Sequence, residues 1–343
     1  MRDKISLQIS GKRIENFLSY RVNSNLFEVA DSFSLSLANP HITIAEGARC
    51  KLYVNDRLEL NGIADRISER YDKSTRSLTV DGRDLTGLLV DSYAEDFTGK
   101  KNESLKALTR RLLAPIPFIN RSAIIFGKGS KDRAVPLTKT EDFEFTETSP
   151  AETVFEKLKQ YALARGMLFF SLPNGTLVFG EPLTSGRAKF LLMCRKNGAD
   201  NNIIEAERVR DISQRYSKVT VTGQRQGTDA LTPEAINVSA GVVDRTFPFY
   251  KPFVAGTEHD GQSPKQYAGS LLERQQFEGF SLRYKTYGHS QNGKNFQVNS
   301  VCHVSDEIYG IEEDFLIYAR TFEMSKQGVF TNLRLSRLGV LPS

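Results

Sequence analysis

The residues best suited by type to do chemistry are three consecutive acids, Glu312, Glu313 and Asp314. Glycoside hydrolases use two carboxyl groups, one of which acts as an acid because an apolar pocket raises its pKa. The three acids lie between Gly310 and an apolar segment that begins at Phe315, which is typical of an exposed turn. Because no apolar pocket is indicated there, we expect solvated carboxylates. A cell-wall hydrolase that uses Glu312 or Glu313 is the alternative hypothesis.

Histidine does not form a metal-binding pattern. No two of the histidines have the i, i+4 spacing with which one helix face holds a metal ion. Cys302 and His303 are neighbours in an expected strand, so their side chains should point to opposite faces. The neighbours His259 and Asp260 do not differ from any other adjacent His and Asp. We expect each histidine to lie at the surface or to be hydrogen-bonded in the interior; the four are His41, His259, His289 and His303.

Cofactor motifs and disulfides are also not indicated. The segment from Gly127 to Lys131 lacks the GxxxxGK[ST] spacing of a phosphate loop, and the chain has neither GxSxG nor GxGxxG. The cysteines, odd in number and far apart, argue against a disulfide framework and are expected as buried thiols; they are Cys50, Cys194 and Cys302. We predict no catalytic, cofactor-binding or metal-binding residues, and no cofactor.

Composition narrows the class of protein. The chain has 343 residues and a net charge of +5, from 46 basic and 41 acidic side chains. A charged fraction of 25% and an apolar fraction of 39% describe a folded chain, and 22 Phe and 12 Tyr favour strands. We expect no secretory signal in Met1–Ser10, since it has no apolar run, and no segment approaches the roughly 18 apolar residues of a membrane span. A membrane protein and a strongly basic nucleic-acid binder are therefore not expected.

The first 81 residues read as short strands separated by turns. Ser32–Leu37 alternates strictly, with Phe33, Leu35 and Leu37 on one face. Asn55-Asp56 is a plausible hairpin turn between two apolar segments. Six or seven strands with no helix between them must pair antiparallel, and a small closed barrel or a sandwich would cover their edges.

Helical patterns follow. Asn102 can cap a helix over Glu103–Leu113, and Ser149-Pro150-Ala151-Glu152 forms a capping box for a second helix that ends at Gly166. Ser263-Pro264-Lys265-Gln266 begins a third helix in the same way.

Strand patterns return at Ile203–Val209, Tyr216–Thr222 and from Phe296 onward. The echo between Leu78–Gly82 and Val219–Gly223 suggests two related barrels. The predicted fold class is mainly β with α+β insertions: two similar antiparallel β-barrels plus two small α/β domains. The predicted units are a first barrel at 1–94, an α/β domain at 95–182, a discontinuous second barrel at 183–227 and 296–343, and a loop-rich α/β insertion at 228–295.

Several segments carry a family resemblance. The most specific is Gly82-Arg83-Asp84-Leu85-Thr86-Gly87-Leu88-Leu89-Val90-Asp91-Ser92. Others are Asp31–Leu35, Asn61-Gly62-Ile63, Ser149–Leu168, Asn174–Val178, Val298–Val304, Gly310-Ile311, Phe315–Arg320 and Thr331–Leu335. Together they resemble the baseplate hub proteins of Mu-like contractile-tail phages, which are related to the late control protein D family and to the hub part of type VI secretion spikes. Phe296 stands where that family often has Trp.

The resemblance implies a structural, non-enzymatic protein of the virion tail baseplate, present in the host bacterial cytoplasm during assembly. It implies a homotrimeric ring that joins a sixfold tail tube, or an adaptor, to a threefold spike and leaves a central channel. DNA could pass through that channel without specific nucleic-acid binding, and no membrane insertion is expected. The sequence does not assign the trimer-interface or lumen residues. The alternative is a tail-associated cell-wall hydrolase, and a nucleic-acid-binding barrel is weakened by the lack of a basic stripe and of Trp.

Overall fold

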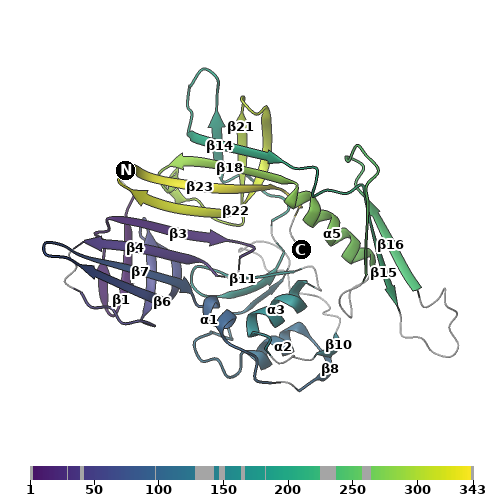
Figure 1. The fold of residues 1–343 in the computed structure, drawn as a ribbon, viewed down its shortest axis with the longest axis horizontal. Helices are drawn as coiled ribbons and strands as arrows, with labels where there is room; N and C mark the ends of the chain where they lie inside the picture. Colours follow the sequence, from purple (N-terminus) through teal and green to yellow (C-terminus); the bar gives the residue numbers. More distant parts are fainter. Residues whose placement is uncertain are drawn as a thin grey trace.

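One large β-sheet with two smaller α/β units attached to it forms the body of the protein (Figure 1). The computed structural model describes residues 3–28, 30–38, 42–96, 98–127, 143–146, 151–163, 167–181, 183–224, 237–256 and 264–340. Among these residues, the large sheet contains 13 strands that come from both ends of the chain.

The first half of the large sheet comes from the N-terminal part of the chain. Its strands are β1 (Ile5–Ile9), β2 (Lys12–Ile14), β3 (Ser19–Asn25), β4 (Ser32–Ala38), β5 (Arg49–Val54), β6 (Arg57–Tyr71) and β7 (Arg76–Asp84). In β4 the expected alternation is confirmed, because Phe33, Leu35 and Leu37 are buried. The turn at Asn55-Asp56 is confirmed too: both residues have positive φ, as the tight turns that match strand twist require.

The second half comes mainly from the C-terminal part of the chain. Its strands are β13 (Phe190–Cys194), β14 (Ile203–Arg210), β18 (Phe280–Tyr287), β21 (Ser300–Asp306), β22 (Ile311–Ser325) and β23 (Gly328–Arg337). β18 falls inside the insertion expected at 228–295, yet it pairs with β14 and β23 in the large sheet. The reason is its own alternation, since Leu282, Tyr284 and Thr286 are buried against the core.

Two closed barrels are not confirmed. The strand pairings run along an open path, β14-β18-β23-β22-β3-β4-β7-β6-β5-β1-β2, with β21 joining β13 to β22. Among the described residues, no pairing closes either half on itself. Instead β22 pairs with β3, so each half covers an edge of the other, and one apolar core runs through both halves.

The two halves nevertheless repeat one strand order. β3-β4-β7-β6-β5-β1 corresponds to β14-β18-β23-β22-β21-β13. Each long strand has a bulge where it pairs with the next strand of its hairpin, between Ala64 and Arg66 in β6 and between Ile317 and Ala319 in β22. When these bulges are aligned, every later pair of the β6-β7 hairpin matches a pair of β22-β23 without a gap, up to the hairpin turn.

The repeat differs from the expected one in two respects. β7 corresponds to β23, whereas the echo at Val219–Gly223 lies in β15, outside the large sheet. In addition, β1 runs antiparallel to β5, but β13 runs parallel to β21. A period-2 pattern defines the faces of a strand and not its partner, so a short echo of that kind cannot identify equivalent strands.

The first α/β unit lies below the large sheet in Figure 1. Its elements are α1 (Thr86–Asp91), β8 (Lys100–Glu103), α2 (Leu105–Leu112), β9 (Ile125–Gly127), β10 (Phe143–Thr146), α3 (Val154–Leu163), β11 (Leu168–Ser171) and β12 (Leu177–Gly180). It has its own apolar core, built around Leu89, Leu108, Leu158 and Phe179.

Two of the three predicted helix starts are shifted by a few residues. α2 is capped by Ser104, whose hydroxyl accepts from the Ala107 amide at 3.2 Å, because Glu103 is held in the β8-β10 ladder. In α3 the capping box is formed by Thr153 and Glu156, whose side chains each accept from the other's amide at 3.1 Å. Residues 147–150 and 164–166 are outside the described part of the chain.

The second α/β unit extends to the right of the sheet in Figure 1. It contains β15 (Lys218–Gln224), β16 (Asn237–Val243), β17 (Pro252–Gly256) and α5 (Pro264–Glu278), while β19 (Ser290–Gln291) and β20 (Lys294–Asn295) form a separate small hairpin. α5 begins at Pro264 as predicted and packs Ala268 and Leu272 against Val219 and Val221 of β15.

Candidate functional site: the seam between the two halves of the sheet

The acidic cluster does not lie in a turn but inside β22. Glu312 and Asp314 point to one side of the strand, where both bind His303 of the neighbouring β21: Nε2 is 2.9 Å from Glu312 Oε1, and Nδ1 is 2.8 Å from Asp314 Oδ1. This arrangement raises the pKa of His303, chiefly through the hydrogen bond to Glu312, and lowers the pKa of Glu312. A carboxylate held in its charged form is the opposite of a catalytic acid.

Other predicted residues are placed as follows. Cys302 is fully buried while His303 is partly exposed, so the two point to opposite faces as expected. Cys50 and Cys302 occupy equivalent positions of the repeat, opposite Gly62 and Phe315, and burial raises the pKa of both thiols. All three cysteines are free, but Cys194 is only half-buried and not the buried thiol expected. His41, His259, Asp260 and most of the segment from Gly127 to Lys131 are outside the described residues.

The feature that sequence patterns missed is the internal seam, defined here as the antiparallel pairing of β3 with β22. It runs from Tyr20 opposite Met324 to Asn25 opposite Ala319. Val22 and Phe322 are opposite one another and both are buried, while Arg21 and Glu323 form an ion pair at 3.5 Å. The seam therefore has an apolar inner side and a charged outer side.

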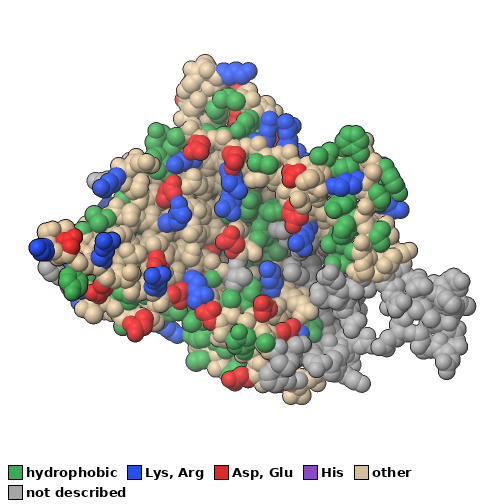
Figure 2. Space-filling view, viewed as in Figure 1, with side chains coloured by type: hydrophobic (Ala, Val, Ile, Leu, Met, Phe, Trp, Pro, Cys, Tyr) green, Lys and Arg blue, Asp and Glu red, His purple; other side chains and the backbone are tan. Residues whose placement is uncertain are grey.

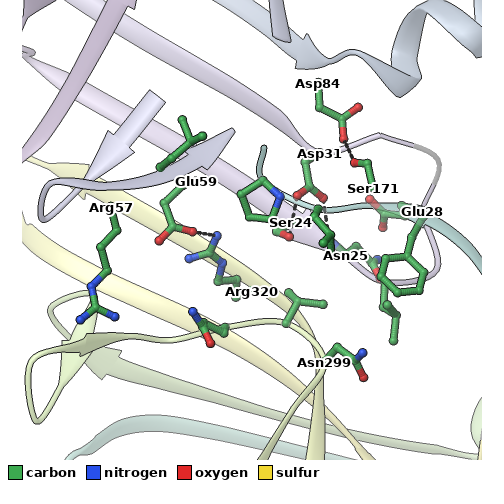
Figure 3. Close-up of a pocket in the computed structure, with 17 residues that line it drawn as sticks. Ser24, Asn25, Glu28, Asp31, Arg57, Glu59, Asp84, Ser171, Asn299 and Arg320 are labelled. Carbon is green, nitrogen blue, oxygen red and sulfur yellow. Dashed lines mark hydrogen bonds and ion pairs between the residues drawn. The ribbon is translucent and has the colours of Figure 1, made fainter. Parts of the chain in front are cut away.

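A buried ion pair lies beside the internal seam. Arg320 Nη2 of β22 is 2.5 Å from Glu59 Oε2 of β6, and each side chain is less than one-tenth exposed (Figure 3). Glu59 Oε1 also accepts from Asn295 at 2.6 Å, and Arg320 Nη1 donates to the Phe296 carbonyl at 2.9 Å. Because a buried charge is tolerated only when it is paired and hydrogen-bonded, these contacts fix how the two halves meet. The one signal in the sequence is a charged residue between Leu58 and Leu60.

His289 supplies a second polar contact between the halves. Its ring is fully buried, with Nε2 2.7 Å from the Tyr20 hydroxyl of β3 and Nδ1 3.1 Å from the Thr331 hydroxyl of β23. Burial lowers the pKa of His289 to about 4, so the ring is neutral near pH 7. The histidine is thus a hydrogen-bonded interior residue, one of the two outcomes expected for it.

Two carboxylates meet where the internal seam approaches the first α/β unit (Figure 3). Asp31 accepts from the Ser24 hydroxyl at 2.7 Å, and Asp84 accepts from the Ser171 hydroxyl of β11 at 2.5 Å. Burial raises the pKa of both groups, and for Asp31 the charge of Asp84 adds to the rise. The cavity between them holds about 90 Å³, well below the roughly 300–1,000 Å³ of a small-molecule site.

The segment from Gly82 to Ser92, which is the most specific part of the family resemblance, joins the large sheet to the first α/β unit. A side chain at Gly82 would collide with the ring of Phe33 and the Ile63 carbonyl. Arg83 binds Asp65 at 2.7 Å and Asp91 at 2.6 Å, and Asp84 accepts from the amide of Thr86 at the start of α1. These contacts lock the orientation of α1 against the sheet.

The described residues hold neither a metal-binding cluster nor a membrane-spanning helix, and the face shown in Figure 2 has mixed charge. Lys and Arg alternate with Asp and Glu over the face of the large sheet shown in Figure 2. In the described ranges, no group of three or more His, Cys, Asp or Glu could hold a metal ion. No described helix combines the length and apolarity that crossing a membrane needs. Unpaired sheet edges and mixed charge on this face suit contacts with other proteins.

Comparison with known families and proteins agrees with this interpretation. Residues 4–84 match the N-terminal domain of the family described as Mu phage baseplate assembly protein GpP-like, and residues 215–268 match the third domain of the family described as tail protein NMB1110-like. Baseplate hub protein gp44 of Escherichia phage Mu is 24% identical over 264 residues, which are 74% of this chain and 65% of the Mu protein.

Solved structures match over almost the whole chain. The tail protein of Neisseria meningitidis MC58 has a TM-score of 0.83 at 25% identity, covering 99% of this chain and 98% of its own. The 43 kDa tail protein of prophage MuSo2 from Shewanella oneidensis has a TM-score of 0.81 at 22% identity, covering 98% and 99%. The E. coli type VI secretion component c3393 shares the fold, with a TM-score of 0.63 at 10% identity, covering 98% and 79%. The predicted resemblance to Mu-like baseplate hub proteins is confirmed.

Proposed function

We propose that this chain, a relative of the Mu-like baseplate hub proteins, is the hub subunit of a contractile phage or prophage tail baseplate. Three copies would form a ring around a central channel, with the tail tube or an adaptor on one side and the spike on the other. The ring would belong to the virion tail baseplate and would assemble in the cytoplasm of the host bacterium. DNA would pass through the channel without specific binding.

The observation that carries this proposal is the repeat of strand order within one chain. Each chain supplies two similar β units, so three chains supply six, and a ring of three presents sixfold-like symmetry on one side and threefold symmetry on the other. That is the adaptation needed between a sixfold tube and a threefold spike. The aligned bulges in β6 and β22 are independent support, because bulges are specific features of a strand rather than accidents.

The proposed division of the chain follows the strands. Residues 1–84 would form one β unit, and 183–210 with 280–343 the other, which regroups β18 with its pairing partners. Residues 85–182, which include α1, and 211–279 are then the two inserted α/β units. Each would be presented on the ring by the β unit to which it is joined, and they are the proposed contacts to tube and spike.

A tail-associated hydrolase is not favoured by any observation. Glu312 and Asp314 bind His303 at an exposed site, and the pKa of Glu312 is lowered rather than raised. Glu313 is exposed on the same strand.

Sedimentation velocity at micromolar concentration, combined with negative-stain imaging, tests the proposal. We expect a species of three times 38.5 kDa and three-lobed rings with a central hole. A monomer across the micromolar range would count against the hub function. Hydrolysis of peptidoglycan that is lost in the Glu312→Gln variant would favour the alternative.

A further inference from the structure

In the described part of the large sheet, β14 and the second half of β6 each leave one edge without a partner. β14 pairs with β18 on one side only, and the second half of β6, residues 65–71, pairs only with β7. Both segments are largely exposed: Val209 is 45% exposed and Tyr71 is 84% exposed. An unpaired edge offers a row of backbone amides and carbonyls to another strand, so a folded protein either protects such an edge or uses it.

The internal repeat identifies the partner of each edge. In the aligned halves, β6 corresponds to β22 and β3 corresponds to β14. The second half of β22 pairs with β3 at the internal seam, so the second half of β6 should pair with a strand equivalent to β3, which is β14. Within one chain the two edges do not meet, since six strands lie between β14 and β6 in the sheet. A second copy of the chain offers each edge its missing partner.

We propose that β14 of one copy pairs antiparallel with residues 65–71 of β6 in the next copy, forming a subunit seam that repeats the internal seam. The proposal rests on the proposed hub function and names the surface that closes the ring. The contact is head-to-tail, because each copy gives β14 on one side and β6 on the other. Such contacts generate closed rings when the rotation between copies closes.

The pairing register follows from the repeat. At the internal seam Val22 is opposite Phe322 and Arg21 is opposite Glu323. The pairings of β14 with β18 and of β6 with β7 show which residues are equivalent. Arg208 is equivalent to Val22 and Glu69 to Phe322, so Arg208 should lie opposite Glu69. In the same way Glu207 should lie opposite Arg70. The same register sets Val209 opposite Ser68 and Ala206 opposite Tyr71.

The charges of the two edges are complementary in that register. Arg208 meets Glu69, Glu207 meets Arg70, and Asp211, one residue beyond β14, meets Arg66. Directly opposed unlike charges stabilise an antiparallel pair, and a one-residue slip would set Arg208 against Arg70. In the outer ion pair of the internal seam, β3 supplies Arg21 and β22 supplies Glu323. In the subunit seam the equivalent strand β14 supplies the acid, Glu207, and β6 supplies the base, Arg70.

The inner side of the subunit seam differs from that of the internal seam. Where the internal seam has the buried apolar pair Val22 and Phe322, the subunit seam has Arg208 and Glu69. Arg208 already lies over the ring of Tyr309, 4.5 Å from its centre, so its charge is positioned before assembly. Within the subunit Glu69 already pairs with Arg76 at 2.8 Å and Glu207 with Arg283 at 3.1 Å. Charged edges keep a free subunit from pairing with unrelated strands and favour one partner in one register.

Disulfide cross-linking tests the subunit seam in the full-length protein. Directly opposed residues of antiparallel strands have Cα atoms about 4.5–5.5 Å apart, within the range that a disulfide spans. In a Cys194→Ser background, we expect the variant with Ser68→Cys and Val209→Cys to form covalent dimers and trimers on mild oxidation. Mixing the two single variants should give dimers only, and neither single variant alone should cross-link.

A register-shifted pair is the matched control. Ser68→Cys with Glu205→Cys uses the same strands and the same face, but the two sites are displaced by about 13 Å along β14. It should cross-link at least tenfold more slowly. Equal cross-linking of both pairs would overturn the register.

The outcomes separate the seam from the hub function. A trimer by mass whose Ser68 and Val209 cysteines stay reduced overturns the subunit seam and leaves the hub function intact. A monomeric unmodified protein overturns both.

If the double-cysteine variant does not fold, exchanging the charges of Glu207 and Arg70 gives the answer. Because Glu207 also pairs with Arg283 at 3.1 Å within the subunit, all of these variants carry Arg283→Gln. Either reversal alone should weaken the trimer, and the Glu207→Arg, Arg70→Glu combination should restore it. Failure of the combined variant to restore assembly overturns the seam.

Discussion

The internal seam and the two open edges are built from equivalent strands, yet they carry different side chains. At the internal seam the inward positions are apolar, with Phe322 fully buried opposite Val22. At the open edges the equivalent inward positions hold Glu69 and Arg208. The first join forms within one chain during folding and is never exposed, so it can be apolar. The edges are exposed in every free subunit, so apolar side chains there would promote aggregation.

The largest expected effect comes from breaking the apolar side of the internal seam. Phe322→Ala should lower the free energy of unfolding by about 3–5 kcal/mol, because it removes a fully buried ring that packs on His289 at 4.5 Å between centroids. Glu69→Ala, at the equivalent position of β6, should change it by no more than about 0.5 kcal/mol. Urea unfolding followed by circular dichroism measures both. A similar loss of unfolding free energy in both variants would contradict the difference between the internal seam and the open edges.

The buried ion pair comes next. Glu59→Gln should cost about 3 kcal/mol, because it leaves the Arg320 guanidinium buried without a counter-charge. Glu15→Gln, which breaks an exposed contact with Arg13, is the control and should have little effect. Chemical denaturation measures the difference. An unchanged midpoint for Glu59→Gln would show that the ion pair does not hold the halves together.

The third effect depends on pH and involves His289. Its folded pKa of about 4 lies below the ordinary value of 6.5, so between these values the unfolded chain binds a proton that the folded chain does not. The contribution of His289 to stability is therefore complete above pH 6.5 and is lost as the pH falls toward 4.

A variant pair separates that contribution from other titrating groups. The stability advantage of the wild type over His289→Gln should shrink by on the order of 3 kcal/mol between about pH 7.5 and pH 4. Tyr20→Phe removes a hydrogen bond to the same ring and adds no group that titrates in this range. Its difference from the wild type should stay nearly constant, and parallel curves for all three proteins would contradict the assignment to His289.

The smallest expected effect concerns the subunit seam. Arg70→Glu should raise the concentration at half-assembly about two- to fivefold for each affected seam, the range measured for single exposed ion pairs. Its folding stability should stay within about 0.5 kcal/mol of the wild type. Sedimentation equilibrium measures the first and urea unfolding the second. Lys51→Glu, at an exposed position of strand β5, is the control and should leave assembly unchanged.

Local features of the fold could be predicted where the residues of one short segment are enough to determine its structure. Ser32–Leu37 alternates and becomes β4, Asn55-Asp56 becomes a tight turn, and α5 begins at Pro264. For the helices capped by Ser104 and Thr153, the sequence predicts starts a few residues too early. Several neighbouring polar residues can cap a helix, and only the surrounding packing selects among them. The local pattern predicts a turn at the acidic cluster, because the pairing of β22 with β21 is not visible in that pattern.

The residues alone are enough to show that this chain is mainly β, that it has no recognisable catalytic motif, and that it resembles the Mu-like hub family. Alternation and turn chemistry are local, and a family pattern is carried by the residues themselves. The neighbours of each strand become visible only in the folded chain: β3 pairs with β22, Glu59 reaches Arg320, and β14 and β6 keep open edges. Strand pairing depends on backbone hydrogen bonds, which every residue type except proline can make, so the choice of partner is decided by packing across the whole chain.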